Sequence, residues 1–294
     1  MTLCEIQRGD AGKSDPFTIL IVASPAYEYN GTISADPVMQ RPAAFDAAVA
    51  HIHASLFGQL PGQCELALGS SGIGSAVRVL AHFEQPAAVD ISCALVSAEK
   101  GVDHFLVPRR EVIAAFASRL GCVADVVFAI SRNPRAYRAC SLPANDDLTR
   151  PGVRYTMDGT AGIHACHSTI PGTVAIDAGS RSLVALHEFH HAMGSVENGQ
   201  IVDLYRGATT EGVNLKRTAQ PQPGVFCIYE GRHYPSEPPA GGSGTSAFFR
   251  CARHDDTQPA LMGNFEEGEP DEACQNDLIT RDFVLDRVKA KVNR

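Results

Sequence analysis

Residues 183–194 constrain the fold more than any other part of the chain, because they combine a complete helix signal with a cluster of histidines. Their sequence is LVALHEFHHAMG. Ser180 or Ser182 can cap the N-terminus of this helix, and Gly194 can end it. The apolar side chains recur at helical spacing and predict a buried face. They are Leu183, Leu186, Phe189, Ala192 and Met193.

His187 and His191 are four residues apart, so on a helix they lie one above the other on one face. Zinc accepts imidazole nitrogens at about 2.0–2.1 Å, and catalytic zinc sites keep one position open for water. Glu188 can reach that water as a general base without being a ligand. The pattern predicts about one Zn²⁺ per chain and a hydrolytic function. The alternative interpretation is a helix that carries surface histidines beside a glutamate. His190 is expected to support the site or the core.

A zinc site needs a third protein ligand, and two acids follow the helix. Glu197 comes three residues after Gly194, where a sharp turn is possible. Asp203 comes later, after the turn signal Asn198-Gly199. We expect Glu197 slightly ahead of Asp203, because a longer loop costs more closure entropy, but that difference is small and both remain open.

The rest of the chain alternates apolar runs with helical patterns. Buried strands are expected at 17–24, 76–83 and 124–130, a short edge strand at 173–178 and a strand at 225–230. Helices are expected from Pro42 to Gly58, over 110–120 and over 277–292. Segments 25–41, 131–172 and 206–275 carry loop composition. This alternation predicts an α/β (α+β) fold with a mixed, partly parallel sheet packed on helices.

Three parts of the chain are expected. Residues 1–16 form a polar N-terminal tail, and residues 17–194 form an N-terminal α/β lobe that ends in the zinc-binding helix. Residues 195–294 form a looser C-terminal lobe that ends in a helix.

Charge and composition limit the kinds of partner and compartment that are expected for this chain. The 294 residues carry a net charge of −8 and no cluster of Lys and Arg, which argues against nucleic-acid binding. The longest apolar run, near 18–23, is too short to cross a membrane. No signal peptide is visible, so a cytoplasmic protein is expected, or a secreted one if the chain is a processed form. Nine cysteines without a CxxC pair favour free thiols. The oligomeric state stays open.

Two stretches resemble a known family. Residues 187–197, HEFHHAMGSVE, resemble the metzincin signature HExxHxxGxxH or HExxHxxGxxD, and ALMG at 260–263 resembles the methionine turn of that clan. Within the clan the closest resemblance is to the igalysin group, the IgA-peptidase-type enzymes, which carry a HEFGH-type helix followed by Asp-Glu-Tyr. This chain has DLY at 203–205. It departs from the pattern at Glu197, where metzincins have His or Asp, and in the later position of Asp203.

The resemblance implies a zinc endopeptidase or aminopeptidase with a cleft between the two lobes, acting on a peptide or protein substrate. Met262 would lie below the metal and support its site. Tyr205 is a candidate for stabilising the oxyanion. Two alternatives stay open: a catalytically inactive zinc-binding homologue, and a zinc hydrolase of a small non-peptide amide. A second metal at His164, Cys166 and His167 is not expected.

Overall fold

The structure is a computed structural model. It describes residues 3–13, 15–58, 68–83, 93–98, 105–142, 144, 153–155, 161–163, 170–180, 182–193, 195–197, 200–202, 226–229, 232–235 and 278–292.

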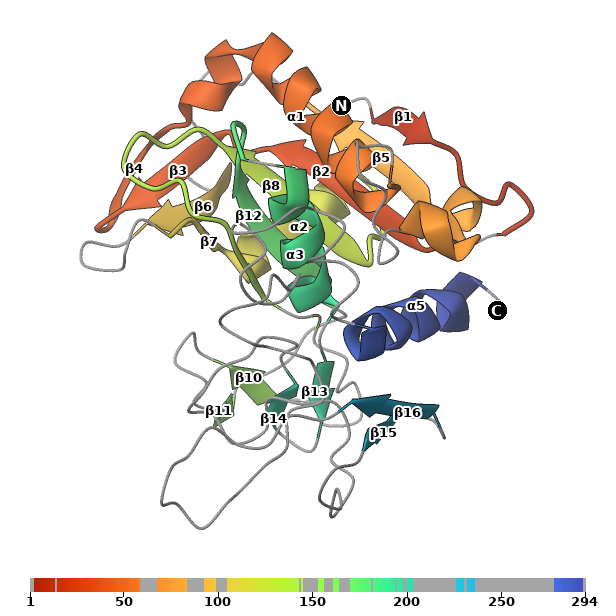
Figure 1. The fold of residues 1–294 in the computed structure, drawn as a ribbon. Coiled ribbons are helices and arrows are strands. Elements are labelled where there is room, and N and C mark those ends of the chain that lie inside the picture. Colours follow the sequence, from red (N-terminus) through yellow and green to blue (C-terminus); the bar gives the residue numbers. More distant parts are fainter. Residues whose placement is uncertain are drawn as a thin grey trace.

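A mixed six-stranded sheet organises the described part of the chain (Figure 1). Its four inner strands run parallel, and the two outer strands pair antiparallel with their neighbours. The prediction of a mixed, partly parallel sheet packed on helices is confirmed. In order across the sheet, the strands are β1 (Cys4–Gln7), β5 (Arg78–His82), β2 (Thr18–Ala23), β8 (Val126–Ser131), β12 (Gly172–Asp177) and β9 (Cys140–Leu142).

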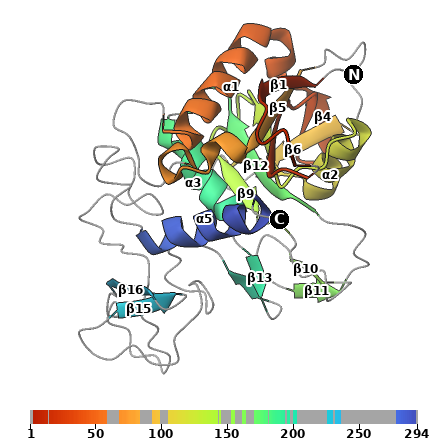
Figure 2. The same cartoon turned by 90° about the vertical axis from the view of Figure 1, so that its right-hand side faces the viewer.

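Helices cover both faces of this sheet. On one face lie α1 (Pro42–Leu56), α3 (Ser182–Ala192) and α5 (Leu278–Val292). On the other face lie α2 (Arg110–Arg119) and strand β6 (Ala94–Ala98), as Figure 2 shows. β6 belongs to a smaller sheet with the order β4 (Thr32–Ala35), β3 (Ala26–Tyr29), β6 and β7 (Val107–Pro108).

Burial on both faces explains why the inner strands are apolar throughout. In β2, Ile19 and Ile21 pack in the core beneath α1 and α3, whereas Leu20 and Val22 pack in the core beneath α2. Successive side chains of a strand point to opposite faces, so a strand covered on both faces has no polar positions. The predicted strands at 17–24, 76–83 and 124–130 are confirmed as β2, β5 and β8.

The predicted helices also form. α1 and α2 are each followed by a glycine with a left-handed backbone, Gly58 at φ 66° and Gly121 at φ 67°. This is the conformation that ends a helix and that glycine adopts without steric cost. The predicted buried face of α1 is confirmed, since Phe45, Val49, Ile52 and Leu56 are all buried.

Several elements lie where the sequence predicted loops. Segment 25–41 forms β3, β4 and the 3-10 helix η1 (Pro37–Gln40). β1 forms within the expected tail and pairs with β5. Strand β12 was predicted at the sheet edge, but it lies between β8 and β9. The edge belongs to β9, a three-residue strand whose pairing partner is about 30 residues away, so local sequence carries no signal for it.

Shorter elements complete the described chain. Two further 3-10 helices are η2 (Leu68–Ser71) and η3 (Gly74–Ala76). Three small antiparallel pairs are β10 (Val153–Tyr155) with β11 (Ala161–Ile163), β13 (Ser195–Glu197) with β14 (Gln200–Val202), and β15 (Phe226–Tyr229) with β16 (Arg232–Pro235). β15 confirms the strand predicted at 225–230.

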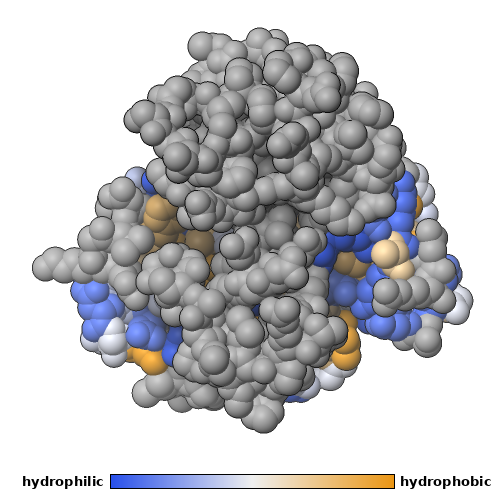
Figure 3. Space-filling view, turned by 90° about the horizontal axis from the view of Figure 1, so that it is seen from below, coloured by the Kyte–Doolittle hydropathy of each residue, from blue (hydrophilic) through white to orange (hydrophobic). Residues whose placement is uncertain are grey.

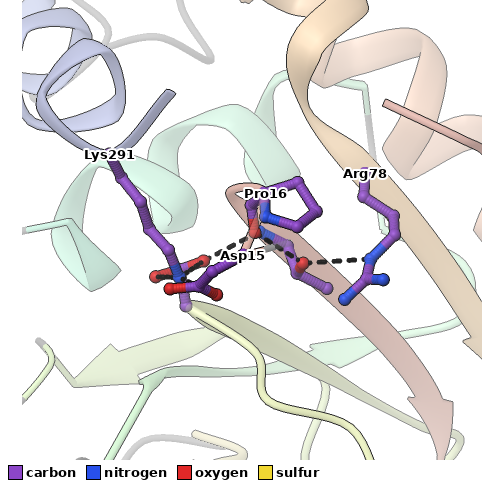
Figure 4. Close-up of polar contacts among 6 residues, drawn as sticks. Asp15, Pro16, Arg78 and Lys291 are labelled. Atoms are coloured by element: carbon purple, nitrogen blue, oxygen red, sulfur yellow. Dashed lines mark hydrogen bonds and ion pairs between the residues drawn. The ribbon is translucent and has the colours of Figure 1, made fainter. Parts of the chain in front are cut away.

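A polar cluster attaches the end of α5 to the sheet (Figure 4). Nζ of Lys291 donates to both carboxylate oxygens of Asp125, at 2.8 and 2.9 Å, and lies 3.2 Å from Oδ1 of Asp15. Oδ2 of Asp125 also accepts the backbone N–H of Thr18 at 2.7 Å, and Nε of Arg78 donates to Oγ1 of Thr18 at 3.1 Å. Burial raises the pKa of Asp125, and the hydrogen bond from Lys291 opposes that shift. The C-terminal helix is therefore held to the amino ends of β2 and β8.

None of the helices in the described part of the chain is long and apolar enough to cross a bilayer. In the view from below, the described residues that are visible are mainly hydrophilic, with small hydrophobic areas between them (Figure 3).

Candidate functional site

Helix α3 positions the site, and it forms because its apolar side chains meet the sheet and α1. Leu183, Leu186, Phe189, Ala192 and Met193 are buried in one core, as the sequence predicted. At the C-terminal end of α3 the packing is unusually close. A Cβ atom added to Gly172, the first residue of β12, would lie 2.5 Å from the carbonyl oxygen of Ala192. Glycine at this position therefore allows the histidine-bearing end of α3 to approach the sheet.

His187 and His191 converge as predicted, and we call them the histidine pair. Their Nε2 atoms are 3.1 Å apart, and the ring planes are inclined by 82°. Two nitrogens bound to one tetrahedral zinc at about 2.0–2.1 Å would be separated by roughly 3.3–3.4 Å, close to the observed distance. The same distance also suits a hydrogen bond between two imidazoles. The geometry thus fits two zinc ligands but needs a further ligand to complete a site.

Glu188 of α3 contacts the edge strand of the main sheet. Its side chain is buried, with the residue 6% exposed, and Oε2 accepts a hydrogen bond from Oγ of Ser141 at 2.6 Å. Ser141 belongs to β9, the edge strand. This contact ties the candidate general base to the edge of the sheet. Sequence reasoning missed Ser141, because the two residues are 47 positions apart and 131–172 has little periodicity.

His190 points away from the pair and into the core. It is fully buried, and its Nδ1–H donates to the carbonyl oxygen of Leu186 at 2.8 Å. Burial lowers the pKa of His190 to about 4, so the ring is neutral at physiological pH. The prediction of a supporting role for His190 is consistent with this position.

The remaining candidates fall on parts that the structure does not describe. Glu197 has a described backbone in β13 but not a described side chain, and Asp203, Tyr205 and Met262 lie outside the described residues, as does 164–167. Among the side chains that are described, no group of three His, Cys, Asp or Glu is arranged to hold a metal. The third ligand therefore stays a prediction.

The chain after α3 forms a short hairpin of β13 and β14. β13 and β14 pair Ser195 with Val202 and Glu197 with Gln200, so two residues join the strands. Asn198 and Gly199, the predicted turn signal, come between these strands in the sequence and lie outside the described residues. The pairing places Val202 beside Ser195, three residues after the end of α3.

The edge strand provides a further feature of the site. β9 pairs antiparallel with β12 on one side, and no described strand pairs with its other side. An extended peptide can add to such an edge through backbone hydrogen bonds. A strand added there would lie next to the strand that contributes Ser141.

Four described cysteines carry free thiols, in line with the expectation from their spacing. They are Cys4, Cys93, Cys122 and Cys140.

Comparison of the chain with models of protein families, with curated proteins and with solved structures finds no match in any of the three.

Proposed function

We propose that this protein is a zinc-dependent metallopeptidase in which His187 and His191 bind the metal and Glu188 is the general base. One observation carries the proposal: the two Nε2 atoms converge to 3.1 Å on the same helix that buries Glu188 beside the sheet edge. A helix with incidental surface histidines has no reason to bury the intervening glutamate. The resemblance of 187–197 to the metzincin signature supports the same assignment.

The chemistry divides between the metal and the chain. Zinc, when bound, would polarise the scissile carbonyl and make water a stronger nucleophile near neutral pH. Glu188 would accept the proton of the attacking water and deliver it to the leaving amine. Ser141 holds the carboxylate of Glu188 in one orientation through its hydrogen bond. Tyr205 remains our candidate for stabilising the oxyanion, and Met262 our candidate for supporting the metal site.

The edge strand favours a peptide substrate over a small amide. The outer side of β9 offers backbone N–H and C=O groups that no described strand pairs with. These groups would bind an extended main chain but gain nothing from a compact amide. Ser141 lies on this same strand, so a peptide bound along it would pass beside Glu188.

The hairpin supports Asp203 over Glu197 as the third ligand, which reverses the slight preference from spacing alone. Glu197 pairs with Gln200 next to the turn, so it lies at the far end of the hairpin from α3. Val202 pairs with Ser195 at the near end, and Asp203 is the next residue. At about 3.3 Å per residue, Glu197 lies roughly 7 Å along β13 from Ser195, whereas Val202 lies beside Ser195.

Activity with a matched pair of variants tests the proposal. Glu188→Gln should retain zinc but lower turnover of a protein substrate by about 10²–10⁴-fold, because it removes a base and not a ligand. His187→Ala should lose the metal as well. An inactive homologue would show no turnover in the unaltered protein. A small-amide hydrolase would cleave amides but no peptide, and near-normal peptidase activity of Glu188→Gln would exclude Glu188 as the base.

A further inference from the structure

We propose that a cavity at the carboxyl end of the main sheet, separate from the histidine pair, binds the carboxylate of a small organic acid with an apolar body. We call it the carboxyl-end cavity. Its volume is about 410 Å³, within the range of small-molecule sites. No described side chain of α3 lines it, so this inference is independent of the proposed peptidase function. Its walls are residues 37 and 41, residues 132–134 and 137 after β8, and Asp177, the last residue of β12.

The topology of the sheet favours a binding site at this place. From β2 the chain passes through α1 to β5 on one side, whereas β8 and β12 lie on the other side of β2. The strand order therefore reverses between β2 and β8. In sheets with parallel strands, ligands bind outside the carboxyl ends at such a reversal.

A buried carboxylate fixes two walls of the cavity relative to each other. Asp36, only 1% exposed, accepts the backbone N–H groups of Val38 and Arg132, each at 2.9 Å, and the hydroxyl of Ser131. These bonds join η1 to the end of β8. Burial raises the pKa of Asp36, and its three donors oppose that shift. The cavity is therefore held in shape without a ligand, which reduces the entropy lost on binding.

Three side chains that line this cavity carry hydrogen-bond donors with no acceptor among the described residues. The exposed guanidinium of Arg41 and the half-buried guanidinium of Arg132 make no hydrogen bond or close ion pair with any described residue. Asn133 is 3% exposed, and its Oδ1 accepts the N–H of Arg135 at 2.9 Å. Its Nδ2 has no acceptor in the described part of the chain. A ligand oxyanion would supply what these groups lack, and a guanidinium matches a carboxylate with two parallel bonds.

The negative charge of Asp177 favours a carboxylate over a phosphate as the anionic group of the ligand. Its carboxylate lies near Arg132, and burial raises its pKa while Arg132 opposes that shift. A phosphate carries about 1.5 to 2 negative charges at neutral pH and would be repelled by Asp177 more strongly than a singly charged carboxylate. The apolar part of the ligand would contact Pro37, Pro134 and the ring of Tyr137, which is 59% exposed.

Calorimetric titration with three probes tests this site. Benzoate should bind the full chain with a Kd of about 1 mM or tighter. Benzamide, its uncharged counterpart, and inorganic phosphate should bind at least about tenfold more weakly. Arg132→Gln should weaken benzoate binding by about tenfold or more, and Arg41→Gln serves as a second variant if Arg132→Gln does not fold. Arg8→Gln, at an exposed arginine outside the cavity, should bind as the unaltered chain does.

Because carboxylates also bind zinc, the titration is repeated in His187→Ala, where benzoate should bind equally well. Three results would overturn the proposal. Benzoate does not bind, or its binding is unchanged in both cavity variants, or phosphate binds more tightly than benzoate.

Discussion

Three histidines within five residues have different surroundings, and helix geometry explains the difference. His187 and His191 share a face of α3, whereas His190 is rotated by about 100° from His191 and faces the core. A charged His190 would be costly there, and its pKa of about 4 keeps it neutral. The same geometry puts Glu188 toward β9, where Ser141 can reach it.

Ser141→Ala should lower kcat by about tenfold, with KM and zinc content unchanged. The hydroxyl orients Glu188, and a hydrogen bond to a charged group contributes about 1.5–3 kcal/mol. Ser141→Thr keeps a hydroxyl and should restore most of the rate, while Ser118→Ala, at an exposed serine of α2, should change nothing. Steady-state kinetics separates these cases. An unchanged kcat in Ser141→Ala would show that this contact does not position the base.

At the scale of elements, the hairpin β13–β14 bears on the third zinc ligand, and helix α5 completes the core. The hairpin places Val202 beside Ser195, and Asp203, our proposed third ligand, follows Val202 in the sequence. Helix α5 buries Val284, Leu285 and Val288 in the same core as α3, and Lys291 attaches its last turn to the sheet. Through α5, the C-terminal part of the chain contributes to the same core as the N-terminal part.

Asp203→Ala should weaken zinc affinity by about 100-fold or more, and Glu197→Ala by much less. Loss of a ligand costs at least as much as loss of a supporting partner, which is about 10–100-fold. Competition with a chelator measures both affinities. The opposite order would return Glu197 to the ligand position.

Lys291→Met should lower the free energy of unfolding by about 1–3 kcal/mol at pH 7, because it leaves the buried carboxylate of Asp125 without its cation. Lys289→Met, on the same helix, should stay within about 0.5 kcal/mol.

The pH dependence of the free energy of unfolding gives a second, independent test of the contact between Lys291 and Asp125. Burial raises the pKa of Asp125 above its ordinary 3.8, and removal of Lys291 should raise it further. As the pH falls through that range, Asp125 takes up a proton in the folded state and no longer needs a cation. The deficit of Lys291→Met should therefore shrink toward pH 4, as denaturant titrations at pH 7 and pH 4 can show. A deficit that is the same at both pH values would mean that Lys291 acts through packing alone.

At the scale of the whole molecule, the sequence predicts those elements whose apolar pattern and end signals lie within the element itself. The apolar runs of β2 and β8 and the glycine-terminated helices α1 and α2 are of this kind. Helix α3 is similar, and its spacing also predicts the histidine pair.

Elements that depend on distant partners are not predictable in this way. β9 is three residues long, and its edge position follows from pairing with β12. β3 and β4 form in a segment whose Pro, Gly and Asn content indicates a loop, because β3 pairs in parallel with β6 more than 60 residues later. Ser141 lies on β9, and the carboxyl-end cavity depends on the bonds of Asp36 to Ser131 and Arg132, 95 and 96 positions later.

Elemental analysis of the protein purified without added metal tests the central claim most directly. We expect about one zinc per chain in the unaltered protein, and none in the double variant His187→Ala, His191→Ala. Glu188→Gln should keep its zinc. A metal-free protein that also fails to take up zinc at neutral pH, or a zinc content that survives loss of both histidines, would contradict the account.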